Sequence, residues 1–532
     1  MPETSGKMKF IEKYRAEIVV MVVLPISYGI WIWRVVQRNL FAPAPGQHAQ
    51  RVLRVCADVR LRKDGKMLLR SDRSSAESHS VRNPDKSAHG KVSMRDLRAI
   101  LGLCGDELHV EPGVTVGEAT RWLLRQEPPL QLECTLEMAN ATLGGLALAT
   151  GMTTHSHVCG LIHDTITEWE VVTGTGEVVV ATAKNEHRDL FRALPWSHGT
   201  LGLLCSLKLR VIPAKRWVKL TYTPLRSNAE MLAAYEDALQ RTTKGDRDAP
   251  FFLEMSVVSK SSGVLMEGRL DDGTASIPCN RIGLWFKPWF FKHVESKLHP
   301  DTLKEELIPL WDYLMRHDRC MCTTMSTIIP YGNTWWFRFF LGWLLPPQMS
   351  FLKASHTEET REASIRKQVY QDLAFPATFF GDALKLADQL FDVYPLMVYP
   401  CMIRDRGGMI SLPNGAKEQM FLNLGIYGIP RALRENPAHP FRMATAVRQL
   451  ESWIRSVGGF QHTYCDSFQR EEEFKTMFDH TLWARMRNKY SADKAFPSIY
   501  EKTRPEMDIW AWLTEEEKLG SCTESSCRAG NE

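Results

Sequence analysis

Residues 145–162, GLALATGMTTHSHVCGLI, place glycines among six Ser, Thr or His side chains. Glycine lets the backbone approach a ligand closely, and consecutive main-chain N–H groups in glycine-rich loops form anion-binding sites. The hydroxyl and imidazole groups from Thr150 to His157 add further hydrogen-bonding groups. The stretch therefore predicts either a phosphate-binding loop or a plain polar bend between two strands, because no GxGxxG or GxxxxGKS/T motif decides between them.

The cysteines indicate neither a metal site nor a disulfide framework. Twelve of them are scattered from Cys56 to Cys527, which favours a reducing compartment. Cys320 and Cys322 are close in sequence, but no further ligand follows at a spacing that suits tetrahedral zinc. We therefore expect no metal and interpret this pair as structural.

Length and charge restrict the class of protein. A chain of 532 residues exceeds what one hydrophobic core usually supports, so we expect two or three folded units. Hydrophobic residues at 44% and charged residues at 24% are typical of a globular protein. A net charge of +4 provides no strongly basic surface, so we expect no nucleic-acid partner.

The N-terminus departs from this globular pattern. Residues 18–33, IVVMVVLPISYGIWIW, carry no charge and have basic residues on both flanks. A helix over this segment would be about 24 Å long, somewhat short of the ~30 Å hydrocarbon core of a bilayer. Trp31 and Trp33 suit a membrane interface, and no small-residue cleavage site follows. We predict a membrane anchor, with a cleaved or buried helix as the alternatives and its orientation left open.

Hydrophobic periodicity predicts the elements that position these residues. The predicted elements are strands over 52–61, 106–112 and 421–428, and helices over 92–103 and 117–126. Two β-branched runs flank Gly174 and Gly176, which predicts a hairpin over 166–183. The pattern up to Pro213 is therefore α+β.

Five motifs follow one another between residues 110 and 204. They are VEPGVTVGEA (110–119), ATLGGLALATG (141–151), SHVCG (156–160), EVVTGTGEVV (170–179) and DLFRALPWSHGTLGLL (189–204). Their order resembles flavoproteins of the vanillyl-alcohol-oxidase type, in which two α+β subdomains hold FAD between them. The resemblance implies a PCMH-type FAD-binding domain with non-covalently bound FAD.

Longer runs narrow this resemblance. WFKPWFFKHVE (285–295), IPAKRWVKL (212–220) and GGFQHTYCDSF (458–468) are similar to the delta(24)-sterol reductases, the Diminuto-type enzymes, and the similarity extends from about residue 50 to 500. It implies an oxidoreductase of sterol biosynthesis that reduces the delta-24 side-chain double bond of a sterol, with FAD as cofactor and NADPH as electron donor. It also implies a place at the endoplasmic reticulum membrane, single-pass or monotopic, with the catalytic part on the cytosolic side.

The resemblance and the composition together imply an α+β architecture in four parts. These are an N-terminal membrane anchor and link (1–45), a two-subdomain PCMH-type FAD-binding domain (46–215), an α+β substrate domain with a C-terminal return (216–510), and a flexible tail (511–532).

The resemblance implies that the loop over 150–162 wraps the diphosphate of FAD and that GTLGLL (199–204) lies against the cofactor. The predicted cofactor-binding residues are Arg73, Gly144, Gly145, Thr150, Gly151, Met152, Thr153, Thr154, His155, Ser156, His157, Val158, Cys159, Gly160, Leu161, Ile162, Gly199, Thr200 and Gly202. Arg73 is included because a guanidinium gains a charge-assisted contact with a diphosphate. Some flavoproteins of this class attach FAD covalently to a histidine near His79, but we interpret His79 as a surface loop residue.

The implied reaction needs an acid and a hydride. Protonation of carbon 24 leaves a tertiary cation at carbon 25, which hydride from reduced flavin quenches. Candidates for the acid, or for a relay to it, are His317, Arg319, Tyr427 and Tyr464, and the sequence does not choose among them. The aromatic runs 285–291 and 335–340 are interpreted as core packing, with an apolar sterol pocket or contact with a bilayer as the alternatives.

Two other functions stay open at this point. One is an FAD-dependent oxidase of an alcohol or a sugar lactone. The other is a non-catalytic sterol-binding protein on a flavin fold, because residues 138–141 (MANA) stand where relatives carry an Asp-Asp pair and residues 71–75 (SDRSS) depart from the usual first cofactor loop. The preferred sterol and the oligomeric state are left open.

Overall fold

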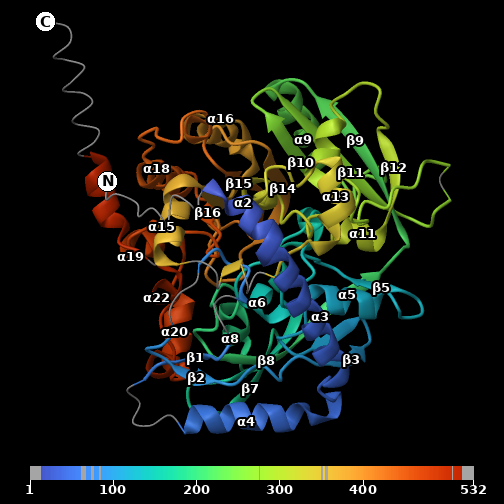
Figure 1. The fold of residues 1–532 in the computed structure, drawn as a ribbon. Coiled ribbons are helices and arrows are strands. Elements are labelled where there is room, and N and C mark those ends of the chain that lie inside the picture. Colours follow the sequence, from blue (N-terminus) through green and yellow to red (C-terminus); the bar gives the residue numbers. More distant parts are fainter. Residues whose placement is uncertain are drawn as a thin grey trace, which may run out of the picture.

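The structure is a computed structural model that describes residues 13–517 except 62–66, 74–76, 83–85, 275, 349–351, 354–356 and 506. Two sheets organise the described residues, one of six strands and one of eight. A long N-terminal helix runs diagonally across the front of the molecule (Figure 1).

Residues 100–213 form the six-stranded sheet, in the order β3-β4-β8-β6-β7 with β5 paired to β8. Its strands are β3 Ile100–Cys104, β4 Glu107–Val110, β5 Leu130–Leu132, β6 Ile166–Val172, β7 Val178–Thr182 and β8 Leu203–Pro213. The helices between them are α5 Val116–Leu123, α6 Leu143–Leu148, α7 Ser156–Cys159 and α8 Arg188–Ala193. A separate parallel pair, β1 Leu69–Ser71 and β2 Gly90–Val92, precedes the sheet.

The eight-stranded sheet is antiparallel, in the order β12-β9-β11-β10-β14-β15-β13-β16. Its strands are β9 Trp217–Leu225, β10 Phe252–Ser259, β11 Ser262–Asp271, β12 Glu305–Pro309, β13 Val369–Pro376, β14 Leu396–Arg404, β15 Glu418–Gly428 and β16 Phe460–Gln461. The accompanying helices are α9 Asn228–Thr243, α10 Phe290–Ser296, α11 Leu310–Leu314, α12 Thr324–Ile328, α13 Trp335–Leu341, α15 Glu358–Lys367, α16 Phe380–Leu390, α17 Arg431–Glu435, α18 Met443–Ser456 and α19 Glu471–Met477.

The alternation of side chains along the central strands gives this sheet two unlike faces. On β13, Val369, Leu373 and Phe375 join a core that also contains apolar residues of α9, α16 and α18. The residues between them, such as Tyr370 and Asp372, therefore point to the opposite face of the sheet. Leu422, Leu424 and Ile426 of β15 repeat the pattern on the neighbouring strand.

The chain returns to the first sheet after the second is complete. Helices α20 Thr481–Lys489, α21 Ala492–Ala495 and α22 Ile499–Thr503 carry this return. Leu482, Met486 and Tyr490 join the core of the six-stranded sheet. A Cβ at Gly174 would lie 2.2 Å from the carbonyl oxygen of Ser491, so only glycine permits this close packing.

Several predicted elements are confirmed and two are wrong. The helix over 117–126, the hairpin over 166–183 and the strands over 106–112 and 421–428 match α5, β6–β7, β4 and β15. Residues 52–61, predicted as a strand, lie in α4 His48–Arg60, where the buried Val52, Val55, Cys56 and Val59 follow helical spacing. The β-branched residues of this segment misled the prediction because their three- and four-residue spacing outweighs β propensity.

Residues 92–103, predicted as a helix, form a loop and strand β3. Gly102 has a φ of 139° and Gly105 a φ of 63°, values that belong to a bulge and a hairpin turn and are incompatible with a helix. These two glycines are the sequence signal that the helical pattern obscured.

Both chain ends bear on the predictions. The predicted helix over 18–33 lies within a continuous helix formed by α2 Arg15–Ile18, a π-helical turn Val19–Val23 and α3 Leu24–Leu40. Residues Arg15–Arg38 are long and apolar enough to cross a membrane. Of the tail expected over 511–532, residues 511–517 are helical and Trp512 is buried. Residues 518–532 lie outside the described part of the chain.

Helix α4 is held to the six-stranded sheet by a buried charge cluster. His48 Nδ1 lies 2.7 Å from Glu111 Oε1, and His48 Nε2 lies 2.6 Å from Glu170 Oε2. Burial lowers the pKa of His48, but the hydrogen bonds to the two carboxylates outweigh it and raise the pKa to about 9. Arg51 supports the cluster with a bond of 2.8 Å from Nε to Glu111.

Replacement of this histidine should therefore cost stability in a pH-dependent way. The folded-state pKa of His48 lies above the ordinary value of 6.5, so its stabilisation is complete below pH 6.5 and is lost as pH rises through about 9. We expect His48→Ala to lower the free energy of unfolding by about 1–3 kcal/mol at pH 6. Denaturant melts should show this gap narrowing by pH 10, and a gap that stays constant with pH would contradict the assignment. The exposed His299→Ala is the matched control.

Candidate functional site

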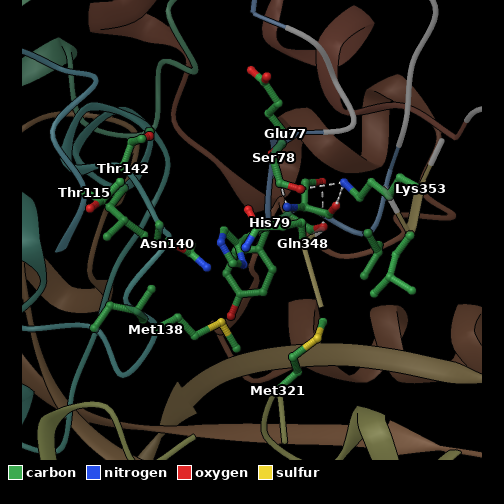
Figure 2. Close-up of a pocket in the computed structure, with 18 of the residues that line it drawn as sticks. Glu77, Ser78, His79, Thr115, Met138, Asn140, Thr142, Met321, Gln348 and Lys353 are labelled. Carbon is green, nitrogen blue, oxygen red and sulfur yellow. Dashed lines mark hydrogen bonds between the residues drawn. The ribbon is translucent and has the colours of Figure 1, made fainter. Parts of the chain in front are cut away.

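A cavity of 1560 Å³ lies where both sheets and the N-terminal helix meet. Pockets for a single small ligand usually measure about 300–1,000 Å³, so this one has room for two ligands side by side. Figure 2 shows part of it, with Met138 and Met321 pointing into the cavity from different walls and His79 beside Asn140. The lining divides into a basic part, an acidic cluster and an apolar part.

The basic part consists of four cations, which we call the basic patch: Arg70, Arg73, Lys86 and Lys502. Burial together with the neighbouring Arg70 and Lys86 lowers the pKa of Lys502 to about 7. Burial and the adjacent Arg70 and Arg73 lower the pKa of Lys86 to about 8. Burial is the larger cause for both lysines and the neighbouring cations add to it, so an anion bound among these buried cations would stabilise their charged forms and relieve their repulsion.

Local hydrogen bonds fix the basic patch in place. Arg73 Nη1 donates to Thr142 Oγ1 at 2.7 Å, and Lys86 Nζ donates to the carbonyl of Arg73 at 2.6 Å. Lys502 Nζ donates to the carbonyl of His198. The patch therefore joins residues from the β1–β2 loop with α22 near the end of the chain.

Glycines next to the basic patch bring backbone up to the cavity wall. A Cβ at Gly144 would lie 2.3 Å from the Cβ of Pro112, so α6 packs against the Pro112-Gly113 turn only because residue 144 is glycine. Gly199 has a φ of 69°, the left-handed region that favours glycine. Thr150 is buried and its Oγ1 has no hydrogen-bond partner in the described part of the chain. This orphaned hydroxyl lines the cavity and fits a polar ligand there.

The structure brings some of the predicted cofactor residues to the cavity and leaves others behind it. Those that line the cavity are Arg73, Gly144, Gly145, Thr150, Gly151, Met152, Gly199 and Gly202. Those outside the lining are Thr153, Thr154, His155, Ser156, His157, Val158, Cys159, Gly160, Leu161, Ile162 and Thr200.

Residues 153–162, the second half of the glycine-containing stretch 145–162, pack against the eight-stranded sheet. The ring of His155 stacks on Phe251 at 3.8 Å between centroids, and His157 Nε2 lies 3.1 Å from the carbonyl oxygen of Pro250. Burial lowers the pKa of His157 to about 4, so its ring is neutral near pH 7. These contacts make residues 153–162 a packed support for the wall that Thr150–Met152 form.

His79 was interpreted as a surface residue, and this interpretation is wrong. Its side chain lines the cavity beside Asn140 (Figure 2). Burial, with Lys353 and Arg73 nearby, lowers the pKa of His79 to about 4. Lys353 Nζ donates to the carbonyl of Ser78 at 2.7 Å and thereby fixes the loop that carries His79.

The acidic cluster is centred on Asp372 of β13, which sequence reasoning missed. Tyr427 and Tyr464 both donate to Asp372 Oδ2, the latter at 2.7 Å, and Asn423 Nδ2 donates to Oδ1 at 3.0 Å. All four side chains line the cavity. The alternation Val-Tyr-Gln-Asp-Leu-Ala-Phe over 369–375 was the available signal, since it places an acid on the face opposite Val369, Leu373 and Phe375.

Burial makes Asp372 a weak acid. It raises the pKa of this carboxyl to about 6 although three hydrogen bonds to its charged form act in the opposite direction. Burial and the adjacent Asp372 raise the pKa of Tyr464 and of Tyr427 well above the ordinary value of 10. A carboxyl of this kind can hold a proton near neutral pH and pass it through a phenol to a bound ligand.

The other two acid candidates lie apart from the cavity lining. His317 is buried with Nε2 3.3 Å from Glu254 Oε1 and 3.3 Å from the hydroxyl of Tyr399. Arg319 donates to backbone carbonyls, including that of Trp285 at 2.8 Å, and so holds the 282–288 loop. Of the four candidates, the structure therefore brings only Tyr427 and Tyr464 together.

The apolar part of the lining comes from the N-terminal helix and from segments around α12 and α13. Its residues are Tyr28, Trp31, Val35, Met321, Ile328, Trp343, Leu344, Leu345 and Leu352. The aromatic runs 285–291 and 335–340 do not line the cavity. Trp289, Phe290, Phe291 and Phe337 are buried in the core as predicted, whereas the other aromatic side chains of the two runs are exposed.

Comparisons with known proteins identify the family. A family model described as FAD binding domain matches residues 40–182. Delta(24)-sterol reductase of Homo sapiens is 33% identical over 491 residues, 90% of this chain and 90% of that protein. The protein of that name from Pisum sativum is 33% identical over 528 residues, 93% and 92% of the two chains. The Delta(24)-sterol reductase homolog of Caenorhabditis elegans is 31% identical over 509 residues, 92% and 94% of the two chains.

The chain belongs to the delta(24)-sterol reductase family. As a member of this family it carries an FAD-binding domain, and FAD is its cofactor. The cavity fits this group, because FAD contains a diphosphate that suits the basic patch and the orphaned hydroxyl of Thr150. Residues 40–182 include Arg73, Lys86 and the glycines of α6.

The basic patch can be tested separately from catalysis. Lys86→Met should weaken FAD binding about 10–100-fold, because a charge-assisted contact with the diphosphate is lost. The same change relieves repulsion in the apoprotein, so the melting temperature of the FAD-free chain should stay the same or rise. Fluorescence titration with FAD and thermal melts measure the two effects, with the exposed Lys260→Met as control. Unchanged FAD affinity would contradict the assignment.

Proposed function

We propose that this chain is an FAD-dependent reductase of the delta-24 side-chain double bond of a sterol. The observation that carries the proposal is the 33% sequence identity to a delta(24)-sterol reductase, which extends along 90% of both chains. The cavity is consistent with it, because a rigid apolar substrate suits the apolar part and a buried weak acid lies in the same cavity.

The proposed reaction needs a hydride and a proton, which come from different groups in the cavity. FAD held at the basic patch would, when reduced, supply the hydride for carbon 25 of the substrate. Asp372 stores the proton for carbon 24 and delivers it through Tyr427 or Tyr464, which leaves Asp372 as a carboxylate. One hydride and one proton added across the double bond balance the reaction. The buried setting keeps water from the developing cation.

The proposal also covers the roles of the two domains, the electron donor and the cellular location. Residues 46–215 bind FAD, with Thr153–Ile162 supporting the cofactor wall, and residues 216–510 bind the sterol and return to the first unit. NADPH serves as the electron donor that reduces FAD. The chain works at the endoplasmic reticulum membrane with its catalytic part on the cytosolic side. The long apolar helix Arg15–Arg38 supports the association with a membrane.

The activity can be tested with purified full-length protein. We expect a yellow protein whose flavin NADPH reduces, which sustains NADPH oxidation beyond one equivalent only when a sterol with an unsaturated side chain is present, and which yields the saturated product. Acid precipitation should release all of the flavin and leave a colourless pellet, because the cofactor is non-covalent. A correctly folded chain without flavin, or flavin that an alcohol bleaches anaerobically while NADPH does not, would refute the proposal.

The role of Asp372 predicts a specific pH dependence. The protonated form is active, and its pKa is raised from 3.8 to about 6, so kcat/KM for the sterol should fall as pH rises through about 6. Asp372→Asn should lower kcat by roughly 10²–10⁴-fold and abolish this limb of the profile. Stopped-flow reduction of the flavin by NADPH should be unaffected, since it does not need this proton.

Controls separate proton transfer from general destabilisation. Glu451→Gln alters another buried carboxyl with a raised pKa, one that accepts from the Phe468 N–H at 2.6 Å and lies outside the cavity lining. It should keep normal catalysis. Tyr427→Phe and Tyr464→Phe tell which phenol delivers the proton, and full activity in Asp372→Asn would exclude this acid.

A further inference from the structure

The N-terminal helix has two unlike faces. Val19, Val20, Val23 and Leu24 are buried in a core that also contains Trp289 and Phe337. The opposite side carries apolar residues that the protein leaves exposed: Met21, Val22, Ile26, Ile32, Trp33, Val36 and Leu40. Met21 is 75% exposed and Trp33 62% exposed. One face of the helix is therefore committed to the protein and the other is available to a partner.

Polar contacts tie the inward face to the cavity wall. Ser27 Oγ accepts from the N–H of Gln348, and Arg34 Nη1 donates to Gln348 Oε1 at 3.2 Å. Arg34 also lies 3.6 Å from Glu77, and Arg38 pairs with Glu118. If this helix crossed a bilayer, these contacts would break or enter hydrocarbon, and Trp289 and Phe337 would lose their cover.

A second apolar element, α13 with the turn that follows it, lies beside this helix. Trp335, Phe339 and Phe340 of α13 are 71%, 61% and 61% exposed. Trp343 meets Tyr28 of the helix edge to face at 4.9 Å between centroids. The neighbouring Trp285 and Phe286 are exposed as well, and the backbone carbonyl of Trp285 closely approaches Gly342. Figure 1 shows α13 beside the upper part of the N-terminal helix on the same side of the molecule.

The two segments that carry the exposed aromatic residues contain only positive charges. Residues 281–292 and 331–346 contain Arg281, Lys287, Lys292 and Arg338 and no Asp or Glu. Tryptophan and phenylalanine with flanking Lys and Arg are the composition that suits the headgroup region of a phospholipid bilayer. An exposed apolar area of this kind marks a binding surface.

We propose that the N-terminal helix lies in the plane of the membrane and does not cross it. Its outward residues together with Trp285, Phe286, Trp335, Phe339, Phe340 and Trp343 form one apolar face, and this face inserts into one leaflet of a phospholipid bilayer. The inward residues meanwhile form a wall of the cavity. The helix is thus a part of the binding site as well as an attachment to the membrane.

This arrangement sets the route of an apolar substrate, a consequence that rests on the proposed function. Tyr28 and Trp31 of the helix and Trp343 behind it line the apolar part of the cavity. A lipid-soluble substrate in the leaflet would reach the cavity beside the apolar face without crossing water.

Topology distinguishes the two arrangements directly. The full chain, with one epitope tag ahead of Met1 and a second after Glu532, is placed in sealed microsomes and treated with external protease. An in-plane helix leaves both tags on the same side, so both should be digested together. Protection of one tag while the other is digested would mean a spanning helix and would overturn the proposal.

Variants of α13 test whether its exposed aromatic residues bind the bilayer. The triple variant Trp335→Ser, Phe339→Ser, Phe340→Ser should lower partitioning of the full chain onto phosphatidylcholine and phosphatidylserine vesicles at least ~tenfold. Its FAD content and its NADPH-driven turnover in detergent should match those of the parent chain. The control triple Leu53→Ser, Leu61→Ser, Leu303→Ser alters equally exposed apolar residues elsewhere and should bind vesicles normally. Equal vesicle binding by both triple variants would refute the apolar face whether or not the chain reduces sterols.

Discussion

The packing of the eight-stranded sheet under α9, α16 and α18 determines the character of the site. Because side chains alternate along a strand, the apolar residues that meet these helices leave every second residue of β13 and β15 on the other face. Asp372, Asn423 and Tyr427 occupy that second set. A shift of one residue in the register would move Asp372 into the helical core, so the hydrophobic core fixes the position of the proposed acid.

Burial acts on the two polar parts of the cavity in the same direction but with different consequences. Desolvation favours the neutral form of Asp372 and the neutral forms of Lys86 and Lys502, because both kinds of charge lose water. The carboxyl can use its neutral form to give a proton. The cations gain when an anion enters, so part of the energy of cofactor binding comes from relief of their mutual repulsion. The apoprotein is therefore less stable than the loaded form.

Much of the first unit could be predicted from the sequence, because its signals are local. The capping Thr115 before α5 and the glycines between β6 and β7 act on adjacent residues. Errors arose where local signals conflict: in α4 the β-branched residues concealed a helical spacing, and two glycines with positive φ, Gly102 within β3 and Gly105 directly after it, were overlooked. His79 was misassigned because a polar loop reads as exposed unless the elements covering it are known.

The acidic cluster could not be predicted in the same way. Tyr427 and Tyr464 were candidates from the family resemblance, yet their meeting point on Asp372 depends on the pairing of β13 with β15 and on a loop that follows β16. Pairings between residues separated by dozens of positions leave no local pattern in one sequence. The choice among four candidate acids therefore required the three-dimensional arrangement.

The return of the chain after the second sheet has a consequence for biosynthesis. Lys502 lies within the last described helices, yet its amino group stands beside Arg70 and Lys86 in the wall of the cavity. While the ribosome is still translating, the first unit has its sheet but lacks this cation and the packing of Leu482 and Met486. The complete basic patch can form only after residue 502 has left the ribosomal tunnel, so a chain that is still being translated lacks one of its four cations.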